Sequence, residues 1–251
     1  MVRKHLRKIK ELQGRFLYLM ISLVIVLLSY SFFKTSSWHT FFSWFIGILV
    51  LGSAVYADSD NKKHLFLAAA LGLSYILFSL FSLFSTSKAL FFLASLSSVI
   101  FFTYTVILII DSMLKKHEVT PNTIYGAISV YLLIGFIFSI VFGFVTFIEP
   151  NSITNSLNAT NTVQNISHPD VLYYSYVTLT TLGFGDFIPT NSVTQTISIL
   201  EAIIGQLYLT ILIALLISNF IPYRRKPKAK KAYVQKKLNE ITKSRRKKIS
   251  K

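Results

Sequence analysis

Long apolar runs are the feature that most limits what this chain can fold into. Their lengths fit the roughly 17–25 residues that a helix needs to cross about 30 Å of hydrocarbon. Only 14% of the 251 residues are charged and 53% are hydrophobic, so a soluble domain would lack polar surface. The sequence predicts an all-α integral membrane protein with six transmembrane helices, at residues 16–33, 38–57, 64–84, 89–110, 123–148 and 192–221.

The basic residues predict the orientation of these spans. Of the 26 Lys and Arg residues, six precede Phe16 and 14 follow Pro222. Two more pairs fall in the loops after the second and fourth spans, and only Lys34 and Lys88 fall on the other side. Because cytoplasmic loops carry the excess of Lys and Arg, we expect a multi-pass protein of the cell membrane with both termini cytoplasmic.

The net charge of +16 raises the question of whether the chain binds nucleic acid or anionic lipid. A nucleic-acid partner is disfavoured, because the charge sits at two ends that flank an apolar body. We expect residues 1–15 and 222–251 to contact anionic lipids at the cytoplasmic face. Within the basic tail, Val234, Leu238 and Ile241 recur at helical spacing, which is typical of an amphipathic helix on the membrane; a disordered tail is the alternative.

The first span raises the question of a signal peptide. Its apolar run from Leu17 to Phe33 has 17 residues, more than the roughly 7–15 of a cleaved signal. We therefore expect a retained span, although Ser29 and Ser31 leave cleavage open. The chain has no cysteine, which excludes disulfides, thiolate metal sites and cysteine nucleophiles.

A polar stretch and a short apolar segment separate the last two spans. Residues 149–169 are rich in Asn, and Asn158 and Asn165 match the glycosylation pattern, which we take only as a sign of an accessible outer loop. Residues 171–182 are too few to cross as a helix and suit a re-entrant pore helix. That segment leads into the motif Thr180-Thr181-Leu182-Gly183-Phe184-Gly185-Asp186.

In this order the region resembles the potassium-channel pore module, with its outer helix, pore helix, Thr-Val-Gly-Tyr-Gly filter and inner helix. The resemblance covers residues 123–221, and Leu182 and Phe184 stand where the filter has Val and Tyr. For the four-helix region 16–110 we find no resemblance. An incidental turn is the alternative for a lone Gly-x-Gly, but seven matched positions between a short and a long helix disfavour it.

The resemblance implies a filter of backbone carbonyls that replace the hydration shell of potassium. The carbonyls of Thr181, Leu182, Gly183 and Phe184, with the Thr181 hydroxyl, would be the ion ligands. Gly183 and Gly185 would tolerate the left-handed backbone that aligned carbonyls require. The side chains of Leu182 and Phe184 would then point away from the ions.

Several neighbours would support this filter. Thr180 and Asp186 flank it, and by resemblance Tyr173 and Tyr174 form an aromatic cuff, with hydroxyls near Asp186 or Phe184. Interfacial tyrosines are the alternative. The carboxylate that pairs with the filter aspartate in some relatives is absent, because Val177 stands there.

Two residues of the final span are candidates for gating. Glu201 is an ionisable residue at membrane depth; we expect it behind the filter, hydrogen-bonded to the pore helix, as a structural brace or an influence on ions. Gly205 lies 19 residues after Asp186, where the resemblance places a hinge glycine. Close helix packing is its alternative.

Some features are missing. No arginine occurs between Arg15 and Arg224, so we expect no steep voltage gating, and no motif indicates an enzyme or a cofactor.

One filter per chain requires four copies, hence a homotetramer, with heteromers open. The sequence predicts a passive potassium-selective channel subunit; a non-selective cation channel and a potassium uptake transporter are the alternatives. The gating stimulus is not predicted.

Overall fold

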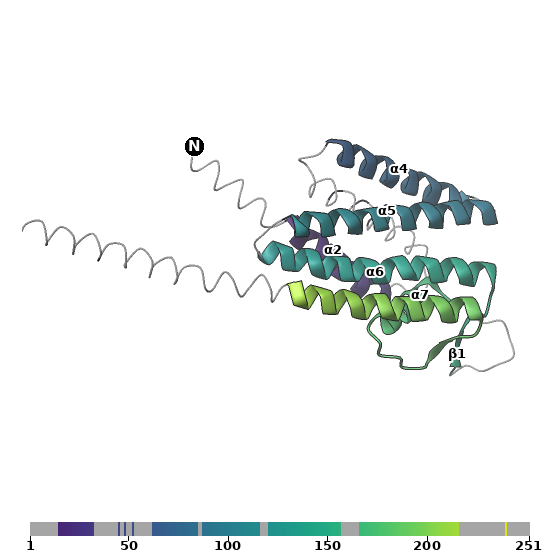
Figure 1. The fold of residues 1–251 in the computed structure, drawn as a ribbon. Coiled ribbons are helices and arrows are strands. Elements are labelled where there is room, and N and C mark those ends of the chain that lie inside the picture. Colours follow the sequence, from purple (N-terminus) through teal and green to yellow (C-terminus); the bar gives the residue numbers. More distant parts are fainter. Residues whose placement is uncertain are drawn as a thin grey trace, which may run out of the picture.

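The computed structural model describes residues 15–32, 62–84, 87–115, 120–156 and 166–215, with isolated positions 45, 48, 52 and 239. These residues form a bundle of long helices with one small sheet (Figure 1). The elements are α2 (Arg15–Phe32), α4 (Lys62–Phe84), α5 (Lys88–Leu114), α6 (Pro121–Ile148), β1 (Ile153–Asn155), α7 (His168–Leu179), β2 (Phe187–Pro189) and a last helix, Ser192–Leu215. We name Ser192–Leu215 the inner helix.

Three described helices are long and apolar enough to cross a membrane. They are α5, α6 and the inner helix, of 27, 28 and 24 residues. The expected spans 16–33 and 64–84 coincide with α2 and α4, whose described apolar parts, Phe16–Leu28 and Phe66–Phe81, are shorter. The expected span 38–57 and the basic tail lie outside the described residues, apart from isolated positions. The prediction of a helical membrane protein is confirmed, and the count of six spans stays a prediction.

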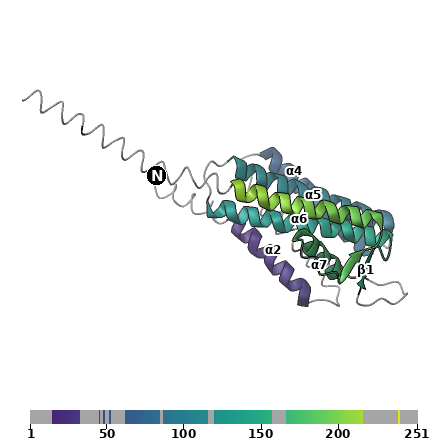
Figure 2. The same ribbon diagram turned by 60° about the horizontal axis from the view of Figure 1, so that its bottom comes forward.

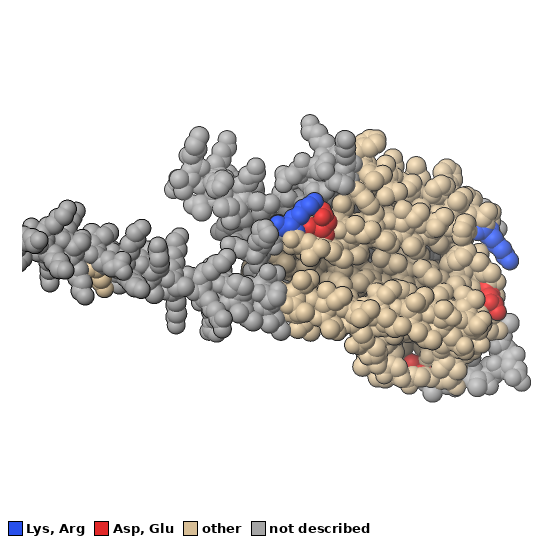
Figure 3. All heavy atoms as spheres, in the orientation of Figure 1, with Lys and Arg blue, Asp and Glu red and all other residues tan. Residues whose placement is uncertain are grey.

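Charge is distributed as a membrane requires. On the face shown in Figure 3, uncharged side chains cover the length of the bundle, and described charges gather at its two ends and lower rim. Lys115 pairs with Asp111 near the end of α5, and the exposed Lys88 begins that helix. Inside the three membrane-competent helices, away from their ends, Glu201 is the one ionisable acidic or basic residue that the structure describes.

Side-chain caps fix where α6 and α7 begin. The Thr120 hydroxyl accepts a hydrogen bond from the Thr123 amide, and the Thr123 hydroxyl accepts one from the Thr120 amide, both at 3.3 Å. Before α7, Asp170 accepts from the Ser167 amide at 3.1 Å and from the Ser167 hydroxyl at 2.6 Å. These contacts satisfy amides at the helix start, and the Asp170 carboxylate complements the positive helix end.

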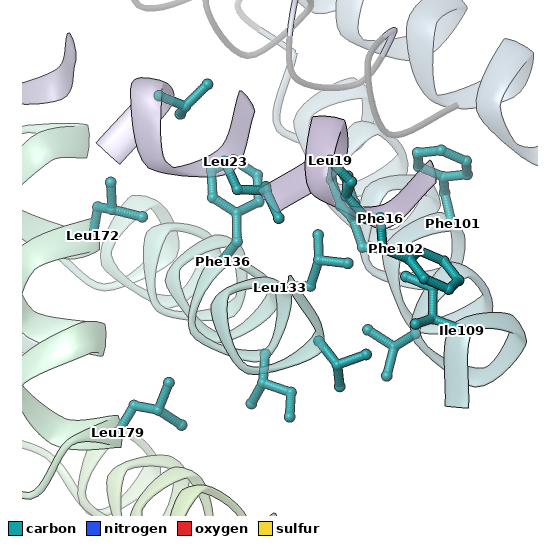
Figure 4. Packing of buried hydrophobic residues seen from close by; sticks show 14 of the residues in the cluster. Phe16, Leu19, Leu23, Phe101, Phe102, Ile109, Leu133, Phe136, Leu172 and Leu179 are labelled. Carbon is teal, nitrogen blue, oxygen red and sulfur yellow. The ribbon is translucent and has the colours of Figure 1, made fainter. Parts of the chain in front are cut away.

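An aromatic cluster joins the preceding helices to α6. Phe102 of α5 is fully buried, and its ring centroid lies 5.7 Å from Tyr75 of α4 and 5.3 Å from Phe136 of α6. Phe101 stacks on Tyr75 at 5.9 Å. Aromatic pairs at these distances contribute about 0.5–1.5 kcal/mol beyond their area burial. Figure 4 shows this layer continuing through Leu133 toward Leu172 and Leu179 of α7.

Helix α2 also packs on α6 (Figure 2). Phe16, Leu19 and Leu23 share one buried face of α2 (Figure 4). The Phe16 amide donates a hydrogen bond to Asn122 Oδ1 at 3.0 Å. Gly126 makes room for this contact, since a Cβ there would lie 3.0 Å from the Phe16 ring. Helices α2 and α5 therefore pack directly on α6, and α4 packs on α5.

Truncating the central ring of the aromatic cluster tests this coupling. Phe102→Ala is expected to lower the free energy of unfolding by about 3–5 kcal/mol, because it leaves a cavity between three helices. Unfolding in detergent micelles measures the loss. Phe66→Ala is the matched control, since Phe66 is 75% exposed and a surface change costs within about 0.5 kcal/mol. Equal losses in the two variants would contradict the packing described.

Candidate functional site

A short helix lies between the two long ones at the heart of the site. Helix α7 has 12 residues, about 18 Å, so it cannot cross a bilayer. It lies against α6 with seven buried residues, at the end of the bundle where β1 lies (Figure 2). Its last turn leads directly into the motif, because the Thr181 amide bonds to the Thr178 carbonyl at 2.9 Å and the Leu182 amide to the Val177 carbonyl at 3.0 Å.

The backbone after α7 alternates in handedness. Thr181, Gly183 and Gly185 have positive φ angles of 58°, 58° and 78°, whereas Leu182 and Phe184 between them do not. Alternation of this kind turns successive carbonyls to one side of the chain. A left-handed glycine costs little, but a left-handed β-branched threonine is strained. The geometry suits a carbonyl filter; the ion-ligand roles of residues 181–185 stay predictions.

A polar side chain of the inner helix contacts the strained threonine. Gln206 Nε2 donates a hydrogen bond to the Thr181 hydroxyl at 3.2 Å. Because that hydroxyl is a candidate ion ligand, Gln206 belongs to the candidate site. Sequence reasoning missed it, although an amide side chain at membrane depth directly after Gly205 was a usable signal.

One side of the motif is open in the single chain. Leu182 and Phe184 are 61% and 66% exposed, and a Cβ at Gly183 or Gly185 would meet no atom within 4 Å. The side chains that the sequence places in packing around the filter are therefore not covered by this chain. A lone chain cannot surround an ion.

The two tyrosines of α7 have different partners. The Tyr173 ring is parallel to that of Phe184 at 6.5 Å and packs edge-on to Phe187 at 5.8 Å. Desolvation is the largest cause that raises the pKa of the Tyr173 hydroxyl. A hydrogen bond to Asp186 and the negative charge of Asp186 raise this pKa further. Tyr174 is buried, and its hydroxyl lies 2.6 Å from the Ser198 hydroxyl of the inner helix. Tyr173 thus lies where a filter cuff is expected, and Tyr174 joins α7 to the inner helix.

The flanking residues have local partners. The Thr180 hydroxyl donates to the Tyr176 carbonyl at 2.6 Å, which satisfies a carbonyl at the end of α7. Asp186 accepts from the Phe187 amide at 3.0 Å. Val177 is buried at the position where some relatives carry a carboxylate, so Asp186 has no such partner on α7.

Glu201 lies at a junction of three helices. It is fully buried, and its Oε1 lies 2.5 Å from the hydroxyl of Ser175 on α7, as the expected bond to the pore helix requires. The same hydroxyl lies 2.7 Å from the Gly135 carbonyl of α6. Ser175 has one hydrogen and cannot donate to both oxygens. A proton on the carboxyl group satisfies both contacts: Glu201 then donates to Ser175, and Ser175 donates to Gly135.

Gly205 packs against the end of α7. A Cβ at this position would lie 2.6 Å from the Leu179 carbonyl oxygen, closer than any side chain permits. Gly205 therefore allows close approach of the inner helix to α7. This contact supports the packing role, and the hinge role stays a prediction.

Tyrosine hydroxyls link the same three helices. Tyr176 of α7 donates to the Leu132 carbonyl at 2.6 Å, and Tyr208 of the inner helix donates to the Ala127 carbonyl at 2.7 Å. Their acceptors both belong to α6, whose Gly135 leaves room for the Tyr176 ring. The sequence offered no signal for these bonds, because each joins residues more than 40 positions apart.

The candidate site thus consists of a short helix and a loop of alternating handedness, which lie between two helices long enough to cross a membrane. Residues 126–221 match the family model described as an ion channel. This part includes every candidate site residue, and the match together with the three apolar helices indicates a membrane protein with an ion-channel region. Comparisons with curated proteins and with solved structures found no match.

Changes at the junction of Glu201 test its role as a brace. Ser175→Ala is expected to lower the free energy of unfolding by about 1–3 kcal/mol, because it leaves a buried carboxyl without a partner. Glu201→Gln is expected to retain most of the stability, since an amide can donate to Ser175 as a carboxylic acid does. Unfolding in micelles measures both.

Thr196→Ala is the control for these variants, because Thr196 is exposed on the same helix and bonds only locally, to the Ser192 carbonyl. A large loss in Glu201→Gln, comparable with Glu201→Ala, would contradict the protonated junction.

Proposed function

We propose that this chain is one subunit of a passive, potassium-selective channel. Its filter is the segment 181–185, and potassium binds to the carbonyls of residues 181–184 and to the Thr181 hydroxyl. The observation that carries this proposal is the alternation of φ at Thr181, Gly183 and Gly185 in a segment whose sequence resembles a potassium filter. Carbonyls aligned in this way can replace the hydration shell of a dehydrated cation.

Four copies complete the proposed site. The polar backbone beside the exposed side chains of Leu182 and Phe184 cannot face lipid, because an unpaired peptide group in hydrocarbon costs several kcal/mol. A ring of four chains would cover these side chains and arrange the carbonyls around a central axis, where ions can satisfy them. Potassium ions are then the permeant partner, in a multi-pass membrane protein with cytoplasmic termini.

Two other functions compete with this one. A non-selective cation channel would need a looser filter, and the parallel rings of Tyr173 and Phe184 favour a braced one. A potassium uptake transporter can also use pore loops, but typically four in one chain, and this chain has one. The reversal potential distinguishes both from a potassium-selective channel.

The reversal potential distinguishes these functions. Purified full-length protein in planar bilayers, with potassium on one side and sodium on the other, is expected to reverse far from zero, toward the potassium equilibrium potential. A passive current that reverses near zero would overturn selectivity. Potassium uptake without a passive current along the potassium gradient would indicate a transporter.

A filter glycine gives the second test. Gly183→Ala is expected to abolish potassium flux with the oligomer intact, since the added Cβ meets no atom within 4 Å and the cost falls on the left-handed backbone. Flux into liposomes and size-exclusion chromatography measure the two properties. Gly143→Ala is the matched control, because its site in α6 is equally open without a positive φ. Normal flux through Gly183→Ala would contradict the carbonyl filter.

A further inference from the structure

The loop after α6 returns to the end of the motif as a strand. β1 pairs antiparallel with β2, with Ile153 opposite Pro189 and Asn155 opposite Phe187. Ser156 follows β1 and lies beside the last residues of the motif. Its amide donates to the Asp186 carbonyl at 2.7 Å. Its hydroxyl lies 2.6 Å from the Gly185 carbonyl and 3.2 Å from the Asp186 carbonyl.

The strand that carries Ser156 is firmly anchored. Ile153 is fully buried in a cluster with Phe142, Val171 and Tyr174. The Ser152 carbonyl accepts hydrogen bonds from the Thr190 amide and the Thr194 hydroxyl, each at 2.9 Å. Because β1 is anchored in this way, Ser156 can hold the carbonyls of Gly185 and Asp186 in place.

The hydrogen bonds divide the carbonyls of the motif into two groups. Within the described residues, the carbonyls of residues 181–184 accept no hydrogen bond, whereas those of Gly185 and Asp186 both bond to Ser156. An unpaired carbonyl is available to a cation, and a carbonyl held by a hydroxyl is oriented by it. The boundary falls where the predicted ion ligands end, at Phe184.

We propose that Ser156 is a positioning residue that clamps the outer end of the filter. Its hydroxyl and amide hold the Gly185 and Asp186 carbonyls, and the clamp prevents the left-handed Gly185 from rotating while ions pass. This role rests on the proposed function, because a filter must exist for its end to be held. Ser156 acts through backbone groups and does not itself contact the ion.

Conduction by single-residue variants tests the clamp. Ser156→Ala removes the hydroxyl and keeps the amide bond to Asp186. In bilayers it is expected to speed the decay of a sustained potassium current several-fold and to raise the sodium-to-potassium permeability ratio. Ser156→Thr restores the hydroxyl and should restore wild-type behaviour. Ser192→Ala, an exposed serine at the start of the inner helix, is the control.

A second measurement separates the clamp from the filter. Hydrogen exchange of the amides at residues 183–187 is expected to quicken several-fold in Ser156→Ala, with the oligomer intact. Wild-type protein that conducts without selectivity would overturn the proposed function alone, and the exchange rates would still decide the clamp. Decay, permeability ratio and exchange all equal to wild type in Ser156→Ala would overturn the clamp.

Discussion

Backbone carbonyls without protein partners are the constraint on which this pore domain depends. Inside a membrane each such group costs several kcal/mol unless protein, water or an ion satisfies it. Among the described residues, the carbonyls of residues 181–184 accept no hydrogen bond, and three neighbouring elements support this segment. Helix α7 leads into it, the inner helix contacts it through Gln206, and the outer strand closes its end through Ser156. These three elements hold the segment in place.

The supports are hydrogen bonds and close contacts between helices, which suits a bundle in lipid. Apolar burial contributes little to helix association there, so small residues and polar bonds carry more of it. Gly205 brings the inner helix onto the Leu179 carbonyl, and the buried pair of Ser175 and Glu201 joins α7 to that helix. Tyr208 ties the inner helix to α6. Movement of the inner helix must therefore act on α7 and on the motif that follows it.

The preceding helices add a layer that a minimal pore does not need. Phe102 connects α4 and α5 to α6, and Phe16 connects α2 to the start of the same helix. Helix α6 thus packs against α2 and α5 and also against α7 and the inner helix. A stimulus that moved α2 or α5 would reach the pore through α6, because packed helices transmit displacement.

The sequence by itself determined the class of protein and the place of the candidate site. Apolar length indicates a membrane helix, and the seven matched positions 180–186 mark the motif, because both properties are local along the chain. Tertiary structure decided the partners. From Val177 the sequence predicted only that a carboxylate is missing behind the filter. The contacts of Ser156, Ser175 and Gln206 join residues 25 to 30 positions apart. These contacts depend on how α7, β1 and the inner helix pack. No local pattern encodes that packing.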